Sequence, residues 1–226
     1  QGAVGDVPRE AKPMKTDELI RAVVADNASM KRPLDQTIAL ALGVGMLAGV
    51  AVFFGVLGPR PDFKWVLANS PRFDFKLFFT LAVAACAFLL TRRLARPDGS
   101  SGSAVWTFAI PLGALAIAVA MELMVLPSDH WLDYARGSNW LICMTMIPIL
   151  SLAPFVAIFY ALRQGAPSNP ARTGAVGGIL AAAVGATLYA THCSDDSPLF
   201  VSIWYIIAMA FVALAGAFLG PRLLRW

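Results

Sequence analysis

The sequence predicts an all-α integral membrane protein, a bundle of six transmembrane helices preceded by a short amphipathic helix. Of its 226 residues, 58% are hydrophobic and 14% are charged, and the mean hydropathy is +0.67. Soluble domains have an apolar share of about half, even when glycine is counted. The lipid bilayer is therefore an expected partner. The formal net charge of +4 is modest and sits in loops beside apolar runs, so we expect no direct contact with nucleic acid.

Six apolar runs supply the membrane-spanning helices. Each is close to the roughly 20 residues that a helix needs to cross the hydrocarbon, and the second run is the shortest. With their loops they form a transmembrane domain over residues 37–226. Gly58-Pro59 and Gly220-Pro221 follow the first and last runs, and both pairs are typical of helix ends. The predicted spans are 37–57, 73–90, 105–126, 140–162, 173–191 and 199–219, each within a few residues.

The basic residues predict the orientation of this bundle. If the N-terminus is cytoplasmic, 13 of the 18 Lys and Arg residues fall on the cytoplasmic side and five on the outer side. An excess of Lys and Arg in short cytoplasmic loops is what sets the orientation of membrane proteins. Both termini are therefore expected in the cytoplasm of a bacterial inner membrane, with the polar loop 192–198 on the periplasmic side.

Residues 14–36 are expected to form a cytoplasmic amphipathic segment. Thr16 can cap its helix. A helix this short does not fold alone in water, so its narrow apolar stripe must lie on the bilayer, on the protein's own loops or on a partner. The stripe consists of Leu19, Ile20, Val23 and Val24. Residues 1–13 contain no apolar run, and because Met14 reads like a natural start, we expect them to be a cloning remnant or a disordered extension.

Small residues recur at every fourth position on two of the predicted spans. Such faces let helix backbones approach closely. They predict a compact bundle, with a homo-oligomer through one of these faces as the alternative. The residues are Gly174, Gly178, Ala182, Ala186 and Ala190 on the fifth span, and Ala41, Gly45 and Gly49 on the first.

Transport is a function to test for any six-span bundle, because coupled transporters place ionisable groups inside the membrane. Apart from Asp74 at the very start of the second run, Glu122 is the only acidic residue inside a predicted span. It lies about one turn from the outer end of its helix, so we expect its carboxylate to reach the outer surface. A small transporter or channel with a structural cysteine loop stays the alternative function. No GxSxG or HExxH motif is present, and we expect no enzyme.

The polar loop His192-Cys193-Ser194-Asp195-Asp196-Ser197-Pro198 separates the last two apolar runs. The predicted topology places Cys143 on the same side of the membrane. In an oxidising periplasm the two thiols can form a disulfide if their helices pack together. With His192 they can instead hold a thiophilic metal ion. Both thiols can also be inert packing residues, which is the expected role of Cys86.

Three stretches resemble one known family. They are Met14-Lys-Thr-Asp-Glu-Leu-Ile-Arg-Ala followed by Arg32-Pro33, the HCSDDSP loop at 192–198, and the final Gly220-Pro-Arg-Leu-Leu-Arg-Trp226. Together they resemble the NrsF-type family, whose members are six-span inner-membrane negative regulators of extracytoplasmic-function sigma factors. The resemblance covers residues 14–226 and leaves out residues 1–13.

The resemblance implies an anti-sigma factor that holds an extracytoplasmic-function sigma factor at the membrane. Its N-terminal segment would bind this partner. By position, Cys143 and Cys193 match the family's paired outward cysteines, which are associated with sensing heavy-metal or oxidative stress. No cofactor is required, and a heavy-metal ion would act as a signal. Metal binding and thiol oxidation both stay open. The predicted partner-binding residues are Leu19, Ile20, Arg21, Val23 and Val24.

Overall fold

The computed structural model describes residues 15–18, 20–21, 33–97, 99 and 102–224. The chain divides into two compact units, residues 1–33 and 34–226, which are described separately. In the first unit, residues 16–18 and 20–21 are helical, and the Ile20 side chain is 54% exposed. The other members of the predicted stripe, Leu19, Val23 and Val24, lie outside the described residues.

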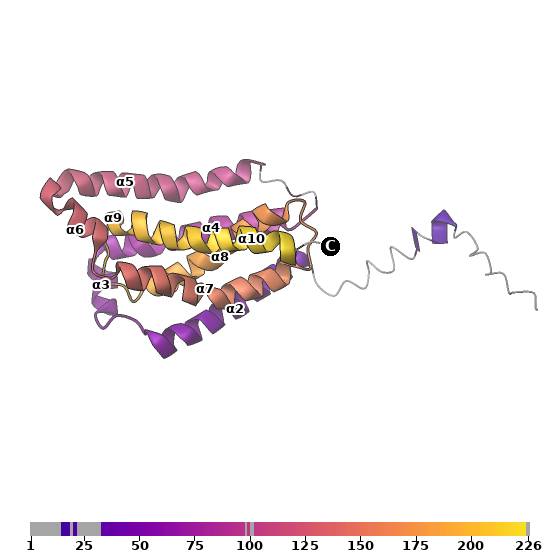
Figure 1. Ribbon diagram of the computed structural model, residues 1–226, viewed down its shortest axis with the longest axis horizontal. Coiled ribbons are helices and arrows are strands. Elements are labelled where there is room, and N and C mark those ends of the chain that lie inside the picture. Colours follow the sequence, from indigo (N-terminus) through magenta and orange to yellow (C-terminus); the bar gives the residue numbers. More distant parts are fainter. Residues whose placement is uncertain (1–14, 19, 22–32, 98, 100–101, 225–226) are drawn as a thin grey trace, which may run out of the picture. The chain divides into compact units, whose positions relative to one another are not determined.

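Among the described residues, six helices are long and apolar enough to cross a membrane (Figure 1). This confirms the predicted all-helical fold with six candidate spans, whereas the side on which the termini lie stays a prediction. The long helices are α2 (Leu34–Val56), α4 (Pro71–Leu94), α5 (Ala109–Val125), α7 (Trp140–Leu162), α8 (Pro170–Ala190) and α10 (Ile206–Leu223). Shorter elements connect them: α3 (Phe63–Asn69), η1 (Gly102–Phe108), η2 (Ser128–His130), α6 (Trp131–Arg136), α9 (Pro198–Phe200) and the π-helical η3 (Val201–Tyr205).

Two helices differ from the sequence prediction in length. The second span, expected to be the shortest, is the 24-residue α4. Ser70 caps it by accepting a hydrogen bond from the Phe73 N–H, and the helix continues past the apolar run through Arg92 and Arg93. The last span does not stop at Gly220-Pro221 but continues to Leu223. Gly220 serves close packing instead, since a Cβ on it would lie 2.2 Å from the Pro170 carbonyl oxygen.

Both small-residue faces are used inside the bundle. A Cβ on Gly174 of α8 would lie 2.2 Å from the Gly216 carbonyl oxygen of α10. A Cβ on Gly45 of α2 would lie 2.7 Å from the Cα of Pro154 in α7. These backbone approaches confirm the prediction of a compact bundle and leave neither face free for a second copy.

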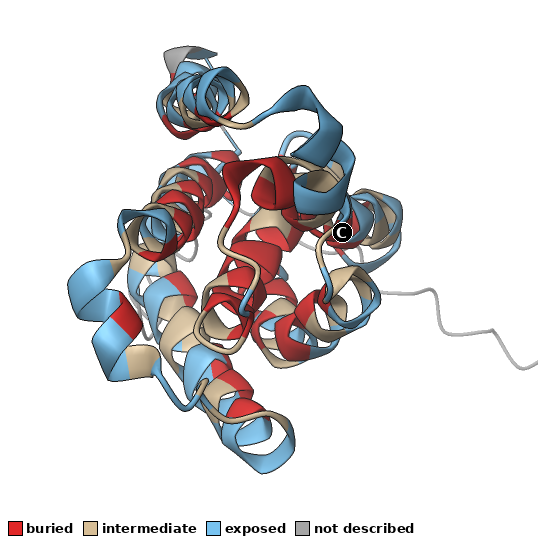
Figure 2. Ribbon diagram, turned by 90° about the vertical axis from the view of Figure 1, so that its left-hand side faces the viewer, coloured by how far each residue is buried: buried red, intermediate tan, exposed pale blue. Residues whose placement is uncertain are grey.

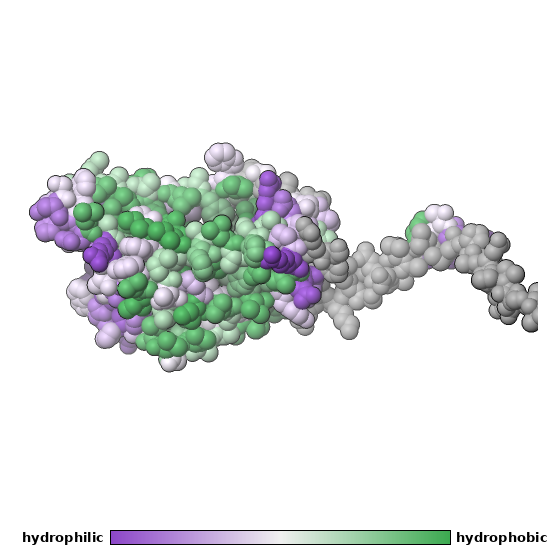
Figure 3. All heavy atoms as spheres, viewed as in Figure 1, coloured by the Kyte–Doolittle hydropathy of each residue, from purple (hydrophilic) through white to green (hydrophobic). Residues whose placement is uncertain are grey.

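The bundle is built around α8, the most buried of the six spans, whereas α5 is the least buried and lies at the edge (Figures 1 and 2). Viewed from the end that carries α3, α6 and α9, the buried residues gather in the centre of the bundle (Figure 2). On the face drawn in Figure 3, hydrophobic residues cover the middle and hydrophilic residues gather at the two ends. This distribution fits a protein whose middle lies in hydrocarbon.

Candidate functional site: a polar loop over two buried thiols

The α8–α9 loop, residues 191–197, lies at one end of the bundle and is fixed at both of its ends. It starts where α8 finishes, with the Cys193 N–H donating to the Tyr189 carbonyl oxygen at 3.0 Å. It finishes at Ser197, whose hydroxyl caps α9 by accepting from the Leu199 N–H at 3.2 Å. Pro198 follows at the first position of that helix, where its missing N–H costs nothing.

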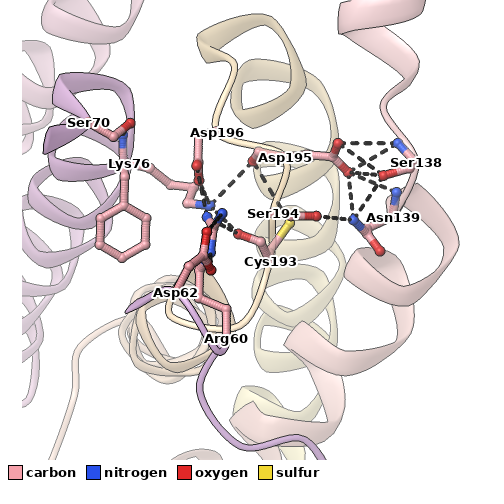
Figure 4. Close-up of polar contacts among 11 residues, drawn as sticks. Arg60, Asp62, Ser70, Lys76, Ser138, Asn139, Cys193, Ser194, Asp195 and Asp196 are labelled. Atoms are coloured by element: carbon pink, nitrogen blue, oxygen red, sulfur yellow. Dashed lines mark hydrogen bonds and ion pairs between the residues drawn. The ribbon is translucent and has the colours of Figure 1, made fainter. Parts of the chain in front are cut away.

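Lys76 of α4 reaches this loop from inside the bundle, and its side chain is 0% exposed. Its ammonium donates to the carbonyl oxygens of Cys193 at 2.8 Å and Asp195 at 3.3 Å, and it forms an ion pair with the Asp196 carboxylate (Figure 4). A buried ammonium needs such partners because leaving it unpaired in an apolar interior is very costly. The loop backbone therefore forms the binding site of this lysine.

Arg60, between α2 and α3, binds the other oxygen of Asp196. Its Nη1 donates to Asp196 Oδ2 at 2.9 Å, and its Nε and Nη2 hold the Asp62 carboxylate at 2.7 and 2.9 Å (Figure 4). This guanidinium keeps the pKa of Asp62 below its usual range. Asp196 thus joins two cations from two different parts of the chain, and we call Lys76, Asp196 and Arg60 the ion-pair cluster.

Asp195 points the other way, to the start of α7. Its carboxylate accepts from the backbone N–H groups of Asn139 at 2.8 Å and Ser138 at 3.1 Å, and from the side chains of both residues (Figure 4). A carboxylate stabilises the positive end of a helix, and here it satisfies the N–H of Asn139, the residue that precedes the first turn of α7, and the N–H of Ser138 before it. Gly137 makes the approach possible, because its φ is +61° and a Cβ there would lie 2.4 Å from the Phe200 ring.

Glu122 of α5 corrects one prediction. Its carboxylate does not reach the outer surface but is buried, with 3% of the side chain exposed. It accepts from the Ser197 hydroxyl at 2.7 Å and the Leu199 N–H at 3.1 Å, and Arg72 lies 3.2 Å from its second oxygen. The two hydrogen-bond donors replace water at Oε2, whereas buried Oε1 has only the Arg72 ion pair and no hydrogen-bond partner among the described residues. Glu122 is therefore the polar link between α5 and the α8–α9 loop.

The structure brings the two predicted sensor cysteines into one buried cluster. Cys143 is 0% and Cys193 is 1% exposed, and the cluster also contains Tyr189, Phe200 and Tyr205. Both are free thiols. Burial raises the pKa of the Cys193 thiol, an effect that the neighbouring Lys76 ammonium partly opposes. Cys86 stands apart in α4, half-buried, with its sulfur 3.4 Å from the Thr107 carbonyl oxygen.

His192 does not join the two thiols in a metal-binding set. Its Nδ1 lies 2.8 Å from the Gly58 carbonyl oxygen. Within the described ranges, no group of three or more His, Cys, Asp or Glu side chains is placed to hold a metal ion. Binding of a thiophilic ion by Cys143 and Cys193, with or without a moved His192, stays a prediction.

Sequence reasoning missed the residues that hold the loop in place. Arg60 and Lys76 are two of the five basic residues that the predicted topology places on the outer side, and no contact with the loop was predicted for either. A signal was nevertheless present, because Lys76 stands within the run Phe73-Asp-Phe-Lys-Leu-Phe-Phe79, where an unpaired cation is not tolerated.

The fold and this site define a six-span helical membrane protein whose polar groups serve to join helices. In the described part of the chain, Glu122, Lys76 and the loop aspartates are all occupied by such contacts. A coupled transporter needs an ionisable group inside the membrane that is free to bind its ion. The described residues offer no such free mid-membrane carboxylate, so the site does not support the transporter or channel alternative.

The chain belongs to the NrsF family: the family model described as "Negative regulator of sigma F" matches residues 24–226. The chain is 32% identical over 216 residues to the anti-sigma-F factor NrsF of Caulobacter vibrioides (strain NA1000 / CB15N), which covers 94% of this chain and 100% of the relative. It is 31% identical over 215 residues, with the same coverage, to a probable anti-sigma-F factor NrsF of Azospira oryzae (strain ATCC BAA-33 / DSM 13638 / PS). No solved structure matches the chain. Membership of this family of regulators confirms that the protein is not an enzyme.

Proposed function

We propose that this protein is a membrane-bound anti-sigma factor that sequesters an extracytoplasmic-function sigma factor through its cytoplasmic N-terminal segment. The observation that carries the proposal is the match of the family model to residues 24–226, together with near full-length relatives named anti-sigma-F factors. An amphipathic helix binds a partner by placing its apolar stripe in a groove. The exposure of Ile20 is consistent with such a contact.

The proposed orientation places both termini in the cytoplasm and the α8–α9 loop in the periplasm of a bacterial inner membrane. Its support is the excess of Lys and Arg that this topology gives the cytoplasmic side. The sigma factor is then bound beside the membrane, where tethering of the segment raises its local concentration.

We further propose that Cys143 and Cys193 release the sigma factor when an oxidant or a heavy-metal ion modifies them. Changing the bundle from 1:99 to 99:1 in favour of release needs about 5.5 kcal/mol of differential stabilisation. A disulfide, or a metal held by two thiolates, is worth that order of energy if it forms in only one state. Support comes from the burial of both thiols in one cluster beneath a loop that contacts α4, α5 and α7.

Co-purification tests sigma binding. We expect a sigma factor to be captured with the full-length chain from its own cells, and to be lost with the variant Leu19→Asp/Val23→Asp, which places charges in the apolar stripe. Asp26→Ala, off the stripe, is the matched control and should retain it. Normal capture by the double variant, with normal membrane insertion, would contradict the proposed contact.

A second experiment tests release. Cells that carry Cys143→Ser/Cys193→Ser should keep the sigma factor bound under metal or oxidant stress, while Cys86→Ser cells should release it as the wild type does. Release by the double variant would rule out the thiols as sensors without affecting the binding proposal.

A further inference from the structure

We propose that the α8–α9 loop is a gate over the two buried thiols and that the ion-pair cluster of Lys76, Asp196 and Arg60 keeps this gate closed. In this arrangement Lys76 is a positioning residue, which acts on the thiols through the loop. The biological use of the gate rests on the proposed sensing function, but the gate itself is a property of the fold.

The first observation is how the loop covers the sulfur atoms. Cys193 is itself part of the loop and is 1% exposed, and its carbonyl oxygen is the 2.8 Å acceptor of the Lys76 ammonium. Arg60 Nη1 lies 3.5 Å from the same oxygen. The backbone of Cys193 cannot move outward unless both cations release it.

The second observation is that the closed arrangement is interdependent. Asp196 receives Lys76 on one oxygen and Arg60 on the other, and Lys76 is buried. If the carboxylate leaves, the lysine loses its charge partner and must be hydrated or must move. Partial opening is therefore unfavourable, and the loop has two distinct positions. In the open position, water can also reach the Tyr205 hydroxyl, which is buried and has no hydrogen-bond partner among the residues described.

The third observation is a route from solvent to the gate. An open pocket of about 620 Å³ lies against the loop, and its lining includes Ser194, Asp195, Asp196 and Ser197 as well as residues of α6. The pocket thus extends along the loop to the residue next to Cys193. A small water-soluble thiol reagent can reach the outer side of the loop, whereas the sulfur atoms lie behind it.

Thiol labelling tests the gate without any sigma factor. Full-length protein with Cys86→Ala, so that only Cys143 and Cys193 can react, is purified in detergent and treated with a small maleimide. We expect labelling at least about a hundredfold slower than for the same chain denatured in SDS, because reaction requires opening. Lys76→Met and Asp196→Asn should each accelerate labelling at least about tenfold, because each removes one partner of a buried charge pair.

Asp62→Asn is the matched control, because Asp62 binds the same guanidinium as Asp196 but is half exposed, and its side-chain hydrogen bonds go to Arg60 and not to the loop. Its labelling rate should stay within about twofold of the starting protein, since exposed ion pairs contribute little. Equal rates in all variants, or native labelling as fast as in SDS, would overturn the gate.

Lys76→Met could fail to fold, so hydrogen exchange on the same samples provides a second test of loop opening. The N–H groups of Ser138 and Asn139, held by Asp195, should exchange faster in Asp196→Asn, which keeps the shape of the side chain, while the middle of α8 stays protected. Faster labelling without faster exchange at these two residues would contradict loop opening. The gate and its proposed use are tested separately. If labelling and exchange behave as expected, but Cys143→Ser/Cys193→Ser cells still release the sigma factor, the gate stands and only its role in sensing is refuted.

Discussion

Replacing Glu122 by alanine tests whether this carboxylate is a buried structural link or a surface charge. The two readings differ sharply in stability, because a carboxylate in water loses little when it is removed. In the structure, alanine removes the acceptor of the Ser197 hydroxyl at 2.7 Å and of the Leu199 N–H at 3.1 Å.

The expected loss follows from these contacts. Hydrogen bonds to a charged group contribute about 1.5–3 kcal/mol each. The Leu199 N–H keeps a second partner in the Ser197 hydroxyl at 3.2 Å, so its loss is smaller. The ion pair with Arg72 adds less than about 1 kcal/mol, because the Arg72 side chain is half exposed. We therefore expect Glu122→Ala to cost about 2–4 kcal/mol in the free energy of unfolding.

The assay is equilibrium unfolding in mixed micelles with increasing SDS. Glu122→Gln, which keeps an acceptor oxygen, should lose about 1–2 kcal/mol, and Arg72→Gln should lose less than about 1 kcal/mol. Hydrogen exchange should also become faster in the last turn of α5, since Glu122 links this least-buried span to the α8–α9 loop. If Glu122→Ala costs no more than Arg72→Gln, the buried position of the carboxylate is wrong.

Three further predictions follow from the packing, the α7 cap and the buried thiol. In the same SDS unfolding assay, Gly174→Leu should destabilise the protein by about 3 kcal/mol or more, because even a Cβ would lie 2.2 Å from the Gly216 carbonyl oxygen. Gly113→Ala, with open space around it, should change the free energy of unfolding by no more than about 1 kcal/mol. Asp195→Ala should cost about 1–2 kcal/mol by removing the acceptor at the start of α7, whereas Ser194→Ala, which loses one contact with the Asn139 side chain, should have a smaller effect by SDS titration. Burial raises the pKa of Cys193, so the protonated thiol contributes its full share of stability below the unfolded-state pKa of about 8.5, and this share is lost as the pH rises toward the folded-state pKa. The unfolding temperature of the wild type should therefore fall more steeply between pH 8 and pH 10 than that of Cys193→Ser. Parallel curves for the two proteins would contradict the raised pKa.

The sequence by itself determined the class of protein and most of its helices. Hydropathy over about 20 residues is a local property, so the apolar run 140–162 could be placed without any tertiary information, and α7 has the same bounds. The spacing of Gly174, Gly178 and Gly45 likewise predicted close helix packing. Both properties can be read from the sequence because the lipid environment constrains each helix separately.

Only the tertiary structure decided what the charged residues do. Lys76 and Asp196 are 120 positions apart in the sequence. The other contacts that hold the α8–α9 loop also join distant residues: Arg60 and Asp196 are 136 positions apart, Glu122 and Ser197 are 75 apart, and Asn139 and Asp195 are 56 apart. A charge near the end of a span can reach the surface or bind a partner inside the bundle, and hydropathy does not distinguish the two. For Glu122 and Lys76 the choice depended on which donors and acceptors other helices bring within hydrogen-bonding distance, which is fixed by packing around α8 and by no local pattern.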